Sequence, residues 1–172
     1  MSNDRPQPSG AVPVAFGRRL AGSETFRAMF REGMALVEET AGYLDGQGRR
    51  DARRLARAAS LSYATESMRL TTRLMQLASW LLLQRAVNEG DITVDQANHE
   101  RAKVKLGGVS SATEGPSWEG LPDRLKALIK RSLALQERIT RLDGALSVRP
   151  AAADNPVARQ LGRIAEAFGA PR

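Results

Sequence analysis

Residues 61–87 read LSYATESMRLTTRLMQLASWLLLQRAV and form the longest and most apolar run of the sequence. The apolar residues recur at intervals of three and four, without Gly or Pro, which predicts a helix rather than a strand. Between Leu77 and Leu83 they surround the helix, so this part must be covered on all sides. The uncharged window from Arg73 to Arg85 is shorter than the roughly 20 residues that a membrane span needs. The run therefore predicts the central helix of a soluble bundle.

The preceding residues predict a first helix. From Glu24 to Leu44 the apolar residues keep to one stripe at helical spacing, and Ser23 is a suitable N-cap. The connection DGQG at 45–48 is short, which favours an antiparallel hairpin. Because no breaker follows before Gly90, we expect the second helix to run without interruption from about Arg49.

Arginines crowd the predicted start of this second helix, at positions 49, 50, 53, 54 and 57. Cations there oppose the helix dipole by a few tenths of a kcal/mol each. The hairpin is expected to bring Glu38 and Glu39 beside Arg53 and Arg54 as compensation. One interpretation is a solvated, partly salt-bridged face. The other is a partner-binding surface at Arg50, Arg53 and Arg54; nucleic acid is weakly supported as the partner, because no aromatic residues are interleaved.

A third helix is predicted at 121–146, where apolar residues alternate by fours and threes and only Ser132 interrupts the seam. Between the second and third helices, residues 91–106 predict a shorter helix with capping-box spacing of Thr93 and Gln96. Residues 107–120 read as a loop whose Trp118 either docks on the bundle, which is favoured because an exposed Trp is unusual, or is left for a partner. We thus expect an all-α, antiparallel, up-down three-helix bundle with a long central helix and a short extra one.

Both ends of the chain differ from the bundle domain at 23–146. Residues 1–22 are rich in Pro, Gly and Ala and are expected to be disordered. Residues 147–172 are expected to be a flexible tail whose short amphipathic helix is too short to be stable alone. This helix either docks on its own bundle or inserts into another protein's groove as a partner-binding element. Its apolar residues are Val157, Leu161, Ile164 and Phe168.

The chain of 172 residues has a net charge of +7 and offers little chemistry. It contains no Cys, and its single histidine, His99, is expected at the surface. No pair of carboxylates stands at a spacing that places both in the predicted core. We therefore expect no catalysis, no metal and no cofactor, and function carried by surfaces. The N-terminus lacks the order of a secretory signal, so the cytoplasm is the expected location.

The block YATESMRLTTRLMQLASWLLLQRAV at 63–87, with FREGMALVEETAGYLDGQGR at 30–49, resembles the regulator of CtrA degradation family, RcdA, of bacterial cell-cycle proteins. The resemblance covers about Phe26 to Leu106. It implies a homodimeric three-helix bundle that acts as an adaptor for the ClpXP protease. It also implies work with a response regulator and a further adaptor, to deliver substrates such as a cell-cycle transcription factor. The family has no catalytic residues to transfer.

Excess apolar surface on the central helix agrees with a homodimer, because large exposed apolar patches mark interfaces. The expected dimer interface consists of Met75, Trp80, Leu81, Leu82 and Leu83. A tethered tail agrees with an adaptor, because linked binding modules raise local concentration. The alternative is a basic nucleic-acid-binding regulator that uses the cluster from Arg49 to Arg57.

Overall fold

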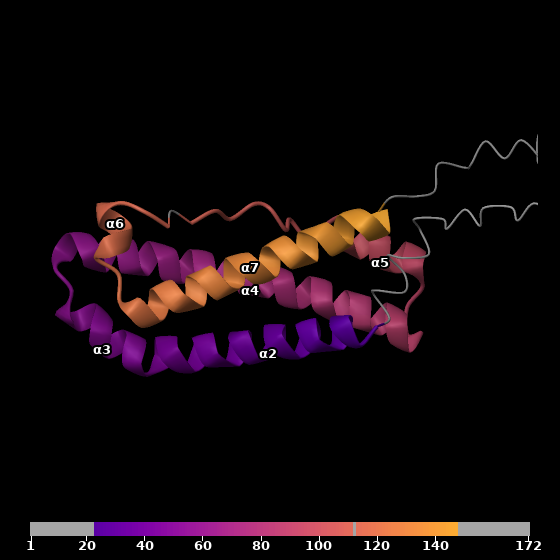
Figure 1. Cartoon of the computed structure of the whole chain (residues 1–172), viewed down its shortest axis with the longest axis horizontal. Coiled ribbons are helices and arrows are strands. Elements are labelled where there is room, and N and C mark those ends of the chain that lie inside the picture. Colours follow the sequence, from indigo (N-terminus) through magenta and orange to yellow (C-terminus); the bar gives the residue numbers. More distant parts are fainter. Residues whose placement is uncertain (1–22, 112, 148–172) are drawn as a thin grey trace, which may run out of the picture.

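The computed structural model describes residues 23–111 and 113–147, which fold into helices and contain no strand. The helices are α2 (Glu24–Asp45), α3 (Gln47–Arg54), α4 (Arg57–Glu89), α5 (Val94–Arg101), α6 (Pro116–Glu119) and α7 (Asp123–Ser147). The long helices α2, α4 and α7 lie along the longest axis of the molecule (Figure 1), and each packs on the other two. The predicted all-α three-helix bundle is confirmed. Segments 1–22 and 148–172 lie outside the described residues, including Val157, Leu161, Ile164 and Phe168.

The direction of α7 differs from the expected up-down order. Arg73 of α4 donates a hydrogen bond to Ser132, and Trp80 donates to Asp143. Residue numbers therefore rise together along the two helices, so α4 and α7 run parallel, while α2 runs against both (Figure 1). The reason is the segment 102–122, which returns along the bundle before α7 begins (Figure 1).

The centre of the core lies on α4. Trp80 and Leu81 are both 0% exposed, and Leu70 and Leu77 are equally enclosed. The Trp80 indole Nε1 donates to Asp143 Oδ1 at 2.7 Å, which satisfies its buried N–H. Within a single chain, α2 and α7 thus cover the sides of α4 that face them.

The chain reverses at Leu55 and Ala56, not at the DGQG connection. Gly46 separates α2 from α3, and Figure 1 shows α3 carrying the chain onward from the end of α2. Leu55 and Ala56 then adopt extended dihedrals, with ψ of 145° and 156°. The expectation of one unbroken helix from Arg49 is therefore wrong. Leu55 packs against the core, which fixes the break, and Arg53 and Arg54 end a helix, where cations suit its dipole.

Close contacts between side chains hold α3 in this position. The Tyr43 hydroxyl donates to Asp51 Oδ2 at 3.1 Å, and burial raises the pKa of Tyr43, so the phenol stays protonated. Gly48 faces Tyr43 and Tyr63 so closely that a Cβ there would lie 2.9 Å from the Tyr43 carbonyl oxygen. The inner face of α3 is therefore rigidly placed against α2 and α4.

Arg73 is fully buried and fastens the returning segment to the bundle. Its guanidinium donates to Ser132 Oγ at 2.9 Å, to Ser111 Oγ at 2.7 Å and to the Val109 carbonyl at 3.3 Å. Burial lowers the pKa of Arg73, and the nearby Glu66 charge opposes that effect. Ser132, which interrupts the apolar seam of α7, is thus the acceptor that a buried arginine requires.

The predictions for the two short helical regions are confirmed in part. The capping box of Thr93 and Gln96 is confirmed, but α5 ends at Arg101 and is shorter than predicted. Within the predicted loop, residues Pro116–Glu119 form α6. Trp118 on that helix is buried, with the Lys130 ammonium 5.7 Å from its ring centroid, so the predicted docking is confirmed.

Two glycines give opposite expectations for stability. Gly48→Ala is expected to destabilise the fold by about 1–3 kcal/mol, because the new methyl overlaps Tyr63 and the backbone of Tyr43. Gly42→Ala is the matched control, since a Cβ at Gly42 meets nothing within 4 Å. It lies inside α2, so alanine is expected to stabilise by about 0.5–1 kcal/mol. Urea unfolding measures both values, and equal effects would contradict the packing described at α3.

Asp143 carries a second stability prediction. It accepts from Trp80 and lies 3.8 Å from the guanidinium of Arg101, which is buried. Asp143→Ala leaves both groups without this partner and is expected to cost about 2–3 kcal/mol. Glu137→Ala on the same helix removes an exposed pair with Arg141 and is expected to cost less than about 0.5 kcal/mol. Thermal unfolding that shows no difference between the variants would refute the role of Asp143.

Candidate interaction surfaces

The described residues form no cluster of three His, Cys, Asp or Glu side chains suited to a metal ion. Among them, no helix is long and apolar enough to cross a bilayer. His99 is exposed on α5, as predicted. The features that stand out are two surfaces, one on α4 and one on α3, and both are built from side chains that the bundle does not use.

The first surface is an apolar stripe along the outer side of α4. Leu61, Met68, Met75 and Leu82 are 71%, 72%, 67% and 52% exposed, respectively. They stand seven residues apart, so they lie in line on one side of the helix, as the equivalent positions of a coiled-coil heptad do. We call these four residues the α4 stripe. It extends over about 30 Å at 1.5 Å per residue.

Small residues fill the α4 stripe between its large side chains. The exposed positions Ala64, Thr65, Thr71, Thr72 and Ser79 lie on this side of α4. The hydroxyls of Thr65, Thr71 and Ser79 donate to the carbonyl four residues earlier in their own helix. If a partner molecule covered this surface, these hydroxyls would keep the hydrogen bonds that they donate within α4.

The structure corrects the predicted dimer interface. Trp80 and Leu81 are enclosed by their own chain, so the expectation that they form exposed apolar surface is wrong. They face α2 and α7 because three and four residues after Leu77 the helix returns to its inner side. Met75 and Leu82 are exposed as expected, and Leu83 is partly buried. Sequence reasoning missed Leu61 and Met68, although their seven-residue interval with Met75 and Leu82 was a visible signal.

The second surface is a group of arginines at the end of the bundle where α3 lies. Arg50, Arg53 and Arg54 on α3 and Arg57 at the start of α4 are exposed. Positions 50, 53 and 54 share one side of α3, opposite Gly48 and the Tyr43 contact. We call these four arginines the basic face.

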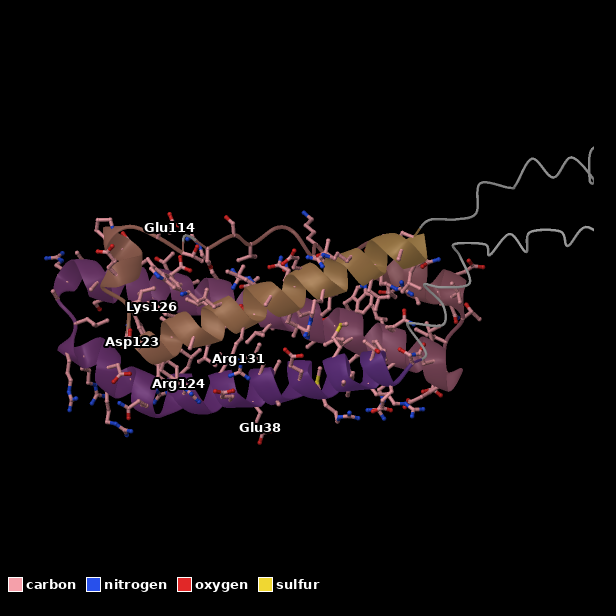
Figure 2. All side chains as sticks on the ribbon, viewed as in Figure 1. Glu38, Glu114, Asp123, Arg124, Lys126 and Arg131 are labelled. Atoms are coloured by element: carbon pink, nitrogen blue, oxygen red, sulfur yellow. The ribbon has the colours of Figure 1, made fainter. Side chains whose placement is uncertain are left out.

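The predicted compensation by Glu38 and Glu39 is wrong. Glu39 forms ion pairs with Arg124 and Arg131 of α7, the second at 2.6 Å. Glu38 points away from the bundle (Figure 2). Both glutamates are distant from Arg53 and Arg54 because α3 continues onward from α2 instead of folding back beside it.

The surface hollows add little chemistry. One, of about 550 Å³, lies between the start of α2 and the end of α4 and is lined by Phe26, Phe30 and Arg85, among others. Arg85 lies 5.1 Å above the Phe30 ring and pairs with Glu89 at 2.7 Å, so its charge already has a partner. Two smaller hollows, of about 320 and 450 Å³, border the α4 stripe at Leu61 and Met68.

Comparison with known proteins gives the relationship of the chain. The family model described as "Protein of unknown function (DUF1465)" matches residues 17–168. The crystal structure of RcdA from Caulobacter crescentus CB15 is 51% identical in sequence, over 74% of this chain and 94% of that chain, with a TM-score of 0.61. A search of curated proteins finds no match. The chain therefore belongs to the DUF1465 family, which is the RcdA family.

Proposed function

We propose that this protein is a non-enzymatic adaptor that delivers regulatory proteins, such as a cell-cycle transcription factor, to the ClpXP protease. The observation that carries the proposal is the 51% identity to RcdA over 94% of the RcdA chain. In this proposal the protein works in the cytoplasm together with a response regulator and a further adaptor. The proposed chemistry is binding only.

The surfaces of the bundle support a binding role. An adaptor needs separate contacts for the molecules that it brings together, and linked contacts raise their effective concentration. The α4 stripe and the basic face are different in chemistry: one is apolar and the other cationic. The C-terminal segment supplies a third contact in this proposal, which rests on the sequence spacing of Val157, Leu161, Ile164 and Phe168.

We further propose that the α4 stripe pairs with the stripe of a second copy. Large side chains seven residues apart with small residues between them are self-complementary, because each Met or Leu can enter the space above a small residue of the facing helix. A two-fold pair of this kind closes on itself and shelters the same surface on both copies. Leu83, which is partly buried, lies at the edge of this proposed interface.

Charge on the α4 stripe is expected to separate the pair without unfolding the chain. Met68→Glu/Met75→Glu puts two carboxylates into the proposed apolar contact, while both positions are exposed in the single chain. At micromolar concentration, we expect sedimentation to give a mass near twice 18.7 kDa for the wild type and near 18.7 kDa for the variant. Circular dichroism should show equal helix content.

The matched control is Ala127→Glu/Ala134→Glu, two exposed positions seven residues apart on α7. This variant should sediment with the wild type. A wild-type protein that sediments as a single chain, or a stripe variant that remains paired, would refute the proposed interface.

Delivery to the protease is expected to depend on the C-terminal residues. Purified full-length protein should accelerate the degradation of a cell-cycle transcription factor by ClpX, ClpP and the priming response regulator, and should hydrolyse neither ATP nor peptide alone. Leu161→Ser/Ile164→Ser should slow delivery several-fold, because it removes two of the four spaced apolar side chains. Ala165→Ser, which leaves those four intact, is the control.

Gel assays of substrate lifetime measure the effect. If full-length protein leaves the lifetime unchanged with every partner present, the adaptor function is wrong. If delivery occurs and both variants deliver equally, the adaptor function stands and the role of the tail is wrong.

A further inference from the structure

Ion pairs are unevenly distributed over the described part of the bundle. Most of its Arg and Lys side chains lie within 4.0 Å of a carboxylate, on α2, α4, α5 and α7 and at Arg49 of α3. Three exceptions are scattered: Arg73 is buried and bonded to serines, Lys130 lies over Trp118, and Lys105 is exposed. The other four exceptions are the members of the basic face.

The basic face therefore concentrates cations that the described fold leaves without carboxylates. Arg50 bonds only to the neutral amide of Gln47, at 2.8 Å. The nearest acidic residue in sequence, Asp51, is turned inward to the Tyr43 hydroxyl and accepts from Gln47. Arg50 stands three and four residues before Arg53 and Arg54, and like charges at this spacing repel by about 0.2–0.5 kcal/mol per pair. The favourable position of Arg53 and Arg54 at the end of α3 opposes this repulsion.

Rigid packing fixes the backbone that carries these arginines. Gly48 and the Tyr43–Asp51 bond fix the inner side of α3, and Leu55 packs on the core between Arg54 and Arg57. The guanidinium groups are thus carried by a fixed backbone, which lowers the entropy that a ligand must overcome on binding.

The segments outside the described residues are themselves basic in composition. Residues 1–22 and 148–172 together contain seven arginines and only three acidic residues. Both are joined to the bundle at Ser23 and Ser147, at the end opposite α3 (Figure 1). An acidic partner molecule would supply the carboxylates that the flanking segments largely lack.

We propose that the basic face binds an acidic segment of a protein partner. Guanidinium groups bind carboxylates through paired, charge-assisted hydrogen bonds. The four arginines fall within eight residues, a length that matches a short run of Asp and Glu rather than a long duplex. The aromatic residues nearest to them, Tyr43 and Tyr63, are buried, so no ring is available there for base stacking. The inference rests on the proposed adaptor function only in requiring a protein partner.

Binding of a labelled oligoglutamate peptide to the full-length protein tests the proposal by fluorescence anisotropy. We expect binding at low salt that Arg53→Glu/Arg54→Glu weakens by at least about tenfold. Lys103→Glu/Lys105→Glu, which makes the same change in net charge just after α5, should bind within about twofold of the wild type. Arg53→Gln/Arg54→Gln, which adds no repulsion, should give an intermediate loss and replaces the reversed variant if that one does not fold.

Three results would overturn the proposal. The first is an absence of peptide binding at low salt, and the second is an equal loss in the Lys103/Lys105 control, which would show attraction to net charge alone. The third is tighter binding of a duplex DNA of matched charge that the Arg53/Arg54 change abolishes. The readout needs no protease, so a failed degradation assay with intact peptide binding would reject the adaptor function and leave this inference in place.

Discussion

Two helices can cover only part of the circumference of a third, and this limit shapes the whole molecule. The 33 residues of α4 face α2 and α7 on one side, where Leu70, Leu77, Trp80 and Leu81 are enclosed. The short helices α5 and α6 also contact α4, but the α4 stripe stays exposed. Enclosing a large apolar side chain contributes about 1.5–3 kcal/mol, so the same helix supplies both the stability of the fold and its most apolar surface.

Buried polar groups give the bundle its particular topology. A parallel α4 and α7 require a long return segment, and residues 102–122 would hold poorly to an apolar surface without hydrogen-bond partners. Arg73 supplies donors to Val109 and Ser111 from inside the core, and Gln136 donates to the carbonyl of Leu106. Because these donors are fixed on α4 and α7, the segment has one favoured path between the ends of the bundle.

The sequence predicts the helices well because their periodicity is strong and local. Helical spacing alone does not say which side of α4 faces inward, and this is why Trp80 and Leu81 were expected at a dimer interface that their burial excludes. Neither Arg73 nor the break at Leu55 has a local signal: the first depends on Ser132, 59 residues away, and the second on core packing without Gly or Pro. The arginines of the basic face were visible in the sequence, but their lack of carboxylate partners depends on the path of α3.

The chain enters the described bundle at Ser23 and leaves it at Ser147, at the same end (Figure 1). The points at which the two flanking segments join the bundle are thus neighbours. The far end, with α3, lies a full bundle length from both junctions (Figure 1), so substitutions on the basic face leave the packing around Ser23 and Ser147 unchanged.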